Sequence, residues 1–209
     1  MAQGELARLT LPVGERDHAQ GPATAPVTLV EYGDYECPYC RAAVPIVQEL
    51  QRLLGEHLCF VFRHFPLTNV HPRAQHAAEA AEAAAAQGQF WEMHASLFQH
   101  QQALDDEHLV HYAVELGLDT ERFQQALAEH SYADRVREDY GSAIESSVDG
   151  TPTFYLDGVR YDEPVGLRQL LAAIRRAHPE VVREGAERVA QRRIPRVVWR
   201  RSQLRPRAR

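Results

Sequence analysis

The sequence is poor in cysteine, contains no lysine and lacks any long run of apolar residues. Three cysteines are too few for the disulfide framework of a small secreted domain, and in a cytosolic protein such a pattern is more often catalytic. A membrane-spanning helix needs about 20 largely apolar residues in succession, so we expect no membrane span. The first residues lack a basic start followed by an apolar stretch, so we also expect no secretory signal and a cytoplasmic location.

The composition is that of a globular protein with an uneven distribution of charge. Of the 209 residues, 44% are hydrophobic and 25% are charged. The net charge is −6, yet residues 175–209 hold 12 Arg against 3 Glu. The Arg-rich tail, residues 179–209, is therefore a candidate contact for nucleic acid or anionic lipid. Because it contains no aromatic-interleaved binding motif, a solvated or locally docked terminus is the favoured interpretation.

The chemistry is concentrated in residues 27–40, where a short apolar run leads into a Cys-Pro-Tyr-Cys motif. The β-branched run Val27–Val30 predicts a buried strand, and a helical pattern begins at the motif. Free N–H groups and the dipole at a helix N-terminus favour thiolate over thiol. Two cysteines at this spacing can also close a disulfide, so the motif predicts thiol–disulfide exchange. Half of a zinc site is the alternative, but zinc takes four ligands and the chain has no second CxxC.

The four residues of the motif have distinct expected roles. Cys37 is expected to be the attacking thiolate, and Cys40, one turn deeper, the resolving thiol that breaks the mixed disulfide. Pro38 suits the first helical turn because its missing N–H would have had no partner there. Tyr39 lies between the two cysteines and is expected to tune the surroundings of the thiolate.

The chain around the motif predicts a βαβ unit. Residues 1–20 form an extended leader, in which Leu9–Val13 is expected to add an edge strand because Pro12 excludes a central one. Apolar residues at helical spacing predict a helix over Arg41–Leu54. Leu58–Phe65, dense in Phe and Val, predicts a second buried strand. Two strands joined through a helix are normally parallel and right-handed.

Residues 67–148 are predicted to form an inserted helical cap. Alanine-rich, amphipathic and aspartate-capped segments follow one another without a strand pattern. The expected helices are Arg73–Ala86 with Pro72 at its first position, Phe90–His100, Asp106–Leu116 capped by Asp105, a helix capped by Asp119, and Tyr132–Ser147. So long a helical stretch between strands does not fit a bare sheet domain.

Strand signals return after residue 148. Thr153–Leu156 and Val159–Tyr161 are separated by Asp157-Gly158, which predicts a β-hairpin with a type I′ turn. Val165–Ala177 then has the apolar spacing of a closing helix.

The order of these features resembles the DsbA-like branch of thioredoxin-fold oxidoreductases. The resemblance covers about residues 18–178 and rests on the Cys-Pro-Tyr-Cys motif, a helix that contains Pro45, the helical insertion, and the Gly-Thr-Pro-Thr segment at residues 150–153. It implies an α/β thioredoxin fold with a helical insertion between its βαβ and ββα halves. The halves would comprise residues 21–66 and 149–178, and the insertion residues 67–148.

The same resemblance implies roles for three further residues. Pro152 corresponds to the cis-proline that lies against the disulfide, and the backbone of Thr151 pairs with the substrate chain. An ordinary trans turn is the alternative at Pro152. Glu31 matches an acidic residue beneath the disulfide, whose raised pKa would let it relay the proton that Cys40 must lose. A surface glutamate at a strand end is the alternative there.

Two carboxylates flank the motif and oppose a second negative charge on Cys37. Asp34 and Glu36 are therefore expected to raise the pKa of its thiol against the effect of the helix dipole. The result would be a milder oxidant than DsbA itself.

Cys59 and the histidines receive plainer interpretations. Cys59 sits alone inside a predicted strand and is expected to fill the core. His64, His71 and His76 lie in one region and could converge on a metal, but scattered helix-surface histidines are the favoured interpretation, and we expect no metal site.

The sequence as a whole predicts a thiol–disulfide oxidoreductase acting on protein or small-molecule disulfides and dithiols. No metal or organic cofactor is required, because the electrons pass through the sulfur atoms. Two alternatives stay open: a redox-switched binding or sensor protein, and a nucleic-acid-associated protein that acts through its Arg-rich tail.

Overall fold

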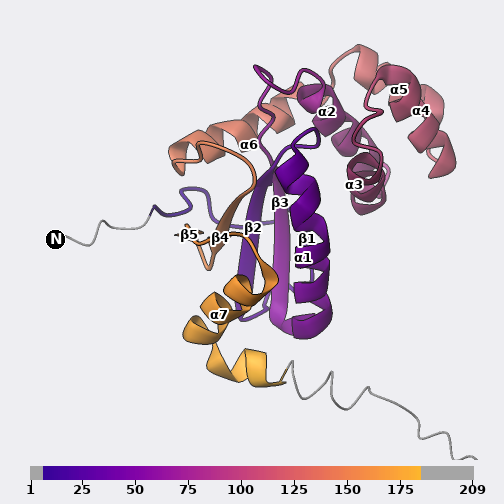
Figure 1. The fold of residues 1–209 in the computed structure, drawn as a ribbon. Helices are drawn as coiled ribbons and strands as arrows, with labels where there is room; N and C mark the ends of the chain where they lie inside the picture. Colours follow the sequence, from indigo (N-terminus) through magenta and orange to yellow (C-terminus); the bar gives the residue numbers. More distant parts are fainter. Residues whose placement is uncertain (1–6, 185–209) are drawn as a thin grey trace, which may run out of the picture.

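The structure, a computed structural model, describes residues 7–184 and is built on a five-stranded sheet with helices on both faces (Figure 1). The strands are β1 (His18–Gln20), β2 (Val27–Gly33), β3 (Leu58–His64), β4 (Thr153–Leu156) and β5 (Val159–Tyr161). The helices are α1 (Pro38–Leu54), the short 3-10 helix η1 (Gly55–His57), α2 (Ala74–Ala85), α3 (Phe90–Gln99), α4 (Asp106–Glu115), α5 (Thr120–Ala128), α6 (Ala133–Glu145) and α7 (Leu167–Ala177).

The sheet has the strand order β1-β3-β2-β4-β5. The strands β2 and β3 are parallel and joined through α1, so the predicted βαβ unit is present. The strand β4 pairs antiparallel with both β2 and β5. Asp157 and Gly158 both have positive φ at the hairpin between β4 and β5, as the predicted type I′ turn requires.

Alternation along the strands divides the apolar core into two clusters. Leu29 of β2 and Phe62 of β3 face the cluster formed with α1 and α7, which continues into the cap. Val30 and Val61 face the opposite cluster, where α6 covers the sheet. Adjacent side chains on a strand point to opposite faces, so one seven-residue strand supports both halves of the core.

The helices α2–α6 follow one another between β3 and β4 and gather toward one end of the sheet, where α6 also packs on one face (Figure 1). Buried charged groups join them to the sheet. Glu82 of α2 lies 2.9 Å from His18 and 3.0 Å from His64, and Asp139 of α6 lies 2.7 Å from Arg16. A buried carboxylate is tolerated when hydrogen bonds and cations surround it, so these contacts fix where the cap sits.

The edge strand lies later in the chain than the sequence predicted. Leu9–Val13 is not a strand; His18–Gln20 pairs with β3 instead, inside the segment expected to be an extended leader. The carbonyl groups of Leu11 and Pro12 accept hydrogen bonds from the buried guanidinium of Arg63, at 2.9 and 3.2 Å. These carbonyl groups therefore accept hydrogen bonds from a buried cation and not from a neighbouring strand.

Several helix boundaries also differ from the predicted ones. The helix α1 begins at Pro38, three residues before the predicted Arg41, because the motif itself forms the first turn. The helix α2 begins at Ala74, so Pro72 lies in the preceding turn and not at the first helical position. Most of the predicted Arg-rich tail, residues 185–209, lies outside the described residues. Within residues 7–184, no helix has both the length and the apolar composition that a membrane crossing demands.

Two glycines with positive φ provide a matched test of the packing between β1 and β3. At Gly21 a Cβ atom would lie 2.0 Å from the carbonyl oxygen of Leu58, whereas at Gly158 it would meet nothing within 4 Å. We expect Gly21→Ala to lower the free energy of unfolding by about 3 kcal/mol, because strain and a backbone clash combine. Gly158→Ala should cost only about 1 kcal/mol from its positive φ. Urea unfolding of both variants measures the difference, and equal losses would contradict it.

Candidate active site

The pairing of β2 with β4 brings the two ends of the candidate site together. Tyr32 lies opposite Thr153 in the antiparallel ladder, so the end of β2 lies beside the start of β4. The Cys-Pro-Tyr-Cys motif follows β2, and the Thr151–Pro152 peptide bond, which is cis, immediately precedes β4. The thiol of Cys37 lies 3.3 Å from the carbonyl oxygen of Thr151, 114 residues further along the chain.

Asp34 anchors the loop that carries the motif. Its Oδ1 accepts hydrogen bonds from the backbone N–H groups of Glu36, at 2.7 Å, and Cys37, at 3.2 Å. Its Oδ2 accepts one from the N–H of Leu67 at 2.8 Å and lies 2.9 Å from Nδ1 of His71. The side chain is fully buried. The sequence predicts only a flanking charge at Asp34, whereas the structure shows a carboxylate that connects the motif to the segment leading into α2.

Two more contacts hold this loop against the cap. The Nε2 group of Gln101 donates hydrogen bonds of 2.8 Å to the carbonyl oxygens of both Tyr35 and Cys37. Glu36 accepts a 2.7 Å hydrogen bond from the backbone N–H of Arg73, just before α2. Gln101 follows α3 and was not singled out from the sequence, because a lone glutamine after a helix carries no recognisable signal.

Hydrogen bonds to its sulfur lower the pKa of Cys37 to about 5. The largest cause is the hydrogen bond from the thiol of Cys40; burial acts in the opposite direction, and the Thr151 side chain and the backbone N–H groups of Cys40 and Tyr39 lower the pKa further. Within the described residues the Thr151 hydroxyl is buried and has no hydrogen-bond partner, so its proton is free to turn toward the thiolate. At pH 7 Cys37 is therefore mainly thiolate.

Cys40 and Glu31 have the opposite electrostatic character. Burial, followed by the hydrogen bond to Cys37 and the charges of Glu31 and Cys37, raises the pKa of Cys40 well above its usual value. Burial and the charge of Cys37 raise the pKa of Glu31 to about 8. Glu31 is 4% exposed, so the surface position that was its alternative is wrong. It borders a cavity of about 90 Å³ that His94 and Gln48 also line.

The remaining predicted residues of the motif lie at its surface. Pro38 begins α1, as expected for a residue without an N–H. Tyr39 is 73% exposed, so its contribution to the pKa of Cys37 comes from its backbone N–H and its ring faces solvent. A hollow of about 310 Å³ begins beside Tyr39 and passes Pro152. Its other lining residues are Ala42, Ala43, Ile46, Thr151 and Val165.

Cys59 and the grouped histidines are separate from this site. Cys59 is buried in the core cluster on the α6 side of the sheet. His64, His71 and His76 do not converge, because each lies beside a different carboxylate: Glu82 at 3.0 Å, Asp34 at 2.9 Å and Asp106 at 3.1 Å, respectively. The expectation that they are surface residues is wrong for His64, which is 1% exposed.

A family model described as Thioredoxin matches residues 14–176. The chain belongs to the thioredoxin family. The geometry agrees with this assignment, because the thiol of Cys37 at the start of α1 lies 3.3 Å from the carbonyl oxygen of Thr151, the residue before Pro152.

Solved structures extend the likeness of this thioredoxin-family protein to DsbA-type folds. A thioredoxin-like oxidoreductase from Silicibacter pomeroyi DSS-3 is 29% identical, with a TM-score of 0.70 over 79% of this chain and 94% of that one. BdbD from Bacillus subtilis is 22% identical, with a TM-score of 0.72 over 83% and 98% of the two chains. α-DsbA1 from Wolbachia pipientis is 19% identical, with a TM-score of 0.66 over 87% and 97%. The predicted α/β thioredoxin fold and the resemblance to DsbA-like proteins are confirmed.

Curated relatives of this thioredoxin-family chain carry a different name. It is 51% identical over 169 residues to Na(+)/H(+) antiporter NhaA 3 of Salinispora tropica, covering 79% of this chain and 26% of the relative. It is 44% identical over 162 residues to Na(+)/H(+) antiporter NhaA 1 of Mycobacterium sp. strain KMS, covering 77% and 26%. The chain thus spans about a quarter of the length of the antiporters that it matches.

The pKa of Cys37 tests the hydrogen bonds at its sulfur. We expect half-titration of the thiolate absorbance at 240 nm near pH 5 in the reduced protein. Thr151→Val should raise this pKa by about 1 unit, since a hydrogen bond to a charged group contributes about 1.5 kcal/mol. Cys40→Ala should raise it further, because that hydrogen bond is the larger cause. Thr68→Val, at an exposed position, serves as control; unchanged titration in both site variants would refute the assignment.

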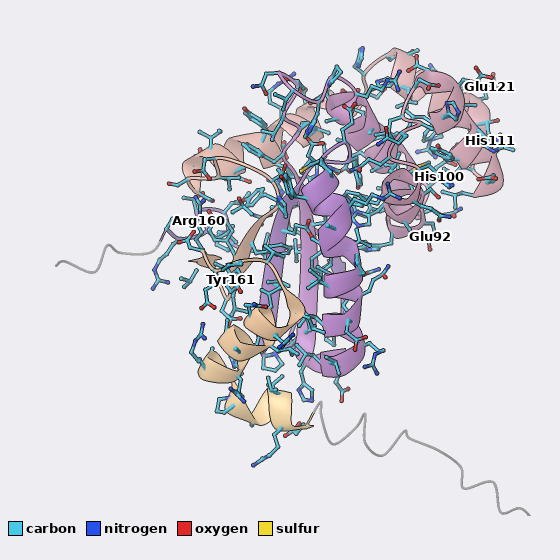
Figure 2. The ribbon with its side chains drawn as sticks, viewed as in Figure 1. Glu92, His100, His111, Glu121, Arg160 and Tyr161 are labelled. Carbon is cyan, nitrogen blue, oxygen red and sulfur yellow. The ribbon has the colours of Figure 1, made fainter. Side chains whose placement is uncertain are left out.

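The burial of Glu31 predicts a pH-dependent stability. Its folded-state pKa of about 8 lies above the usual glutamate value of 4.5, so the folded state binds the proton more tightly and stability falls as pH rises between these values. In a Cys37→Ser background, which has no thiolate at this position, Glu31→Gln should stabilise the protein more at pH 8 than at pH 5, by about 1 kcal/mol or more. Denaturant unfolding measures the change. Glu92→Gln, at an exposed carboxylate of α3 (Figure 2), should show no such trend, and the same flat result for Glu31→Gln would contradict the prediction.

Proposed function

We propose that the protein is a thiol–disulfide oxidoreductase that exchanges protein disulfides through Cys37 and Cys40. The observation that carries the proposal is the opposite shift of the two thiol pKa values beside Thr151 and Pro152. Cys37 is an ionised nucleophile at neutral pH, whereas Cys40 keeps its proton until Cys37 has reacted. Two roles are thereby separated within one turn of helix.

The exchange proceeds in two displacements. The Cys37 thiolate attacks one sulfur of a substrate disulfide, forms a mixed disulfide and releases the other substrate sulfur as thiolate. Cys40 then loses its proton and attacks Sγ of Cys37, which closes the Cys37–Cys40 disulfide and releases the second substrate thiolate. The substrate has gained two electrons and the enzyme has lost two; the reverse sequence oxidises a dithiol substrate.

Glu31 is the proposed acceptor of the Cys40 proton. The negative charge of Cys37 contributes to the raised pKa values of both Glu31 and Cys40. Formation of the mixed disulfide removes that charge, so both pKa values fall; burial, the largest cause of the Glu31 shift, remains, and the smaller pKa of Glu31 favours its role as the acceptor of the Cys40 proton. The cavity of about 90 Å³ beside Glu31 lies between this carboxyl group and the polar side chains of Gln20 and Gln51.

The surface beside Cys37 suits an apolar substrate segment. The hollow of about 310 Å³ is lined by alanines, Ile46, Val165 and Pro152, and Tyr39 stands exposed at its border. The backbone of Thr151 offers strand-like pairing to an extended chain. We propose that the residues next to the substrate cysteine are apolar and bind there.

The direction of exchange depends on the reduction potential of this dithiol against its compartment. We propose a cytoplasmic site of action, where reduction of disulfides would be favoured. Alkylation of the thiols in intact cells, followed by a mobility shift, measures how much of the Cys37–Cys40 pair is oxidised. A fully oxidised pair would contradict the reductive direction.

Reduction of insulin with a recycling dithiol tests the enzymatic proposal. We expect the wild-type protein to accelerate precipitation of the insulin B chain at least tenfold over the dithiol alone. Cys37→Ser should abolish the acceleration, and Cys40→Ala should abolish turnover while accumulating a mixed disulfide on Cys37. Cys59→Ser should behave as wild type, because Cys59 lies in the core on the other face of the sheet. Wild-type protein no faster than Cys37→Ser would overturn the proposal.

A second candidate is a redox-switched binding module. Its support is the identity of 51% with a segment of Na(+)/H(+) antiporter NhaA 3, in which this part is about a quarter of the whole. In such a protein the Cys37–Cys40 disulfide would control docking and turnover would be unnecessary. Absence of insulin reduction together with a binding partner that distinguishes oxidised from reduced protein would favour this candidate.

A further inference from the structure

Two histidines and a glutamate converge in the helical cap, away from the dithiol. His76 and Glu79 lie one turn apart on α2, and His130 follows the end of α5. One potential ligand atom from each residue lies within 4.8 Å of the other two. Ligands each about 2.1 Å from a tetrahedral ion lie about 3.4 Å apart, so modest side-chain rotation would suffice to bind one.

Glu79 is a buried carboxylate that forms no ion pair with an arginine within residues 7–184. It is 1% exposed, and its partners among residues 7–184 are the amide of Gln75, at 2.8 Å, and Nδ1 of His130, at 2.9 Å. The cap's other buried carboxylates, Glu82 and Asp139, lie beside arginine. A buried carboxylate is stabilised by hydrogen bonds and by nearby positive charge, and at Glu79 imidazole groups occupy the place that arginine takes beside Glu82 and Asp139.

The backbone conformation of His130 is also unusual for a histidine. Its φ is +51°, a left-handed conformation in which glycine is the usual residue after a helix. A histidine at this position costs on the order of 1 kcal/mol relative to glycine. That side chain is 64% exposed yet reaches the buried carboxylate of Glu79.

The surroundings suit a metal ion with access to solvent. Two hollows, of about 670 and 910 Å³, meet at His130; His76 lines the first and Glu79 the second. His76 also lies 3.1 Å from Asp106, the kind of carboxylate contact that orients metal-bound imidazoles. The side-chain amide of Gln75 donates a hydrogen bond to Oε1 of Glu79, the oxygen that does not contact His130, and so orients this carboxylate. The rings of His76 and His130 are 5.9 Å apart.

We propose that His76, Glu79 and His130 form a binding site for one divalent transition-metal ion of the zinc class. Two imidazoles and one carboxylate are a common zinc ligand set, and the fourth position would hold water. The ion would join α2 to the turn between α5 and α6, across more than 50 residues of chain. The site lies apart from the dithiol, and its proposal does not rest on the proposed oxidoreductase activity.

Calorimetric titration with zinc chloride tests the site. The tag-free protein of residues 1–209 is used with Cys37 and Cys40 oxidised to the disulfide, so that the thiolates cannot bind zinc. We expect one equivalent to bind, and His76→Ala and His130→Gly each to weaken the affinity at least tenfold. His111→Ala is the control, since His111 is an exposed histidine of α4 paired with Glu115 and points outward from the cap (Figure 2).

His130→Gly separates metal binding from folding. Glycine accommodates a φ of +51° without strain, which offsets the loss of the 2.9 Å contact between His130 and Glu79, so this variant should remain folded in a chelator, with a cooperative melting transition. Zinc should raise the melting temperature of the wild type and of His111→Ala but not that of His130→Gly. Absence of one-site binding in the wild type, or equal zinc affinity in the wild type, His76→Ala and His130→Gly, would overturn the proposal and leave an ordinary histidine–carboxylate pair.

Discussion

The antiparallel pairing of β2 with β4 is the constraint on which the site depends. It sets Tyr32 opposite Thr153. This register brings the cysteine motif after β2 and the proline before β4, from distant parts of the chain, to the same end of these two strands. Because side chains alternate along a strand, a slip of one residue would turn Glu31 away from α1 and place Tyr32 beneath the dithiol. The two core clusters make such a slip costly, since every apolar residue of β2 would exchange faces.

The reactivity of the two cysteines differs because hydrogen bonding and burial compete differently at each sulfur. At Cys37, hydrogen bonds from Cys40, Thr151 and the backbone outweigh burial, so the thiolate is favoured. At Cys40, burial is the largest cause, and nearby negative charge adds to it. The hydrogen bond between the sulfurs acts with opposite sign on its two members. The nucleophile is therefore chosen by the surroundings of each thiol, and the same contact that ionises one keeps the other protonated.

Local signals in the sequence were sufficient for the strand–CxxC–helix unit, the aspartate caps of α4 and α5, and the hairpin at Asp157-Gly158. Contacts between distant segments were not predictable in this way. Gln101 and Asp34 act through backbone groups of other segments, which no residue pattern identifies. The strand His18–Gln20 is short and polar, and it pairs only because β3 offers an edge. The proposed metal ligands were missed because His130 comes from a turn far from the histidines compared in the sequence.

The contacts around the motif imply that the helical cap belongs to the active site and is not an appendage. Asp34 binds the segment before α2, Glu36 accepts from the N–H of Arg73, and Gln101 holds two carbonyl groups of the motif's loop. These hydrogen bonds would be lost if the cap moved away, and the buried side chain of Asp34 would lose its partners outside the motif. Motion of the cap relative to the sheet is therefore coupled to the geometry at Cys37. Any partner, ion or attached domain that stabilises the cap would bias the dithiol through these same hydrogen bonds.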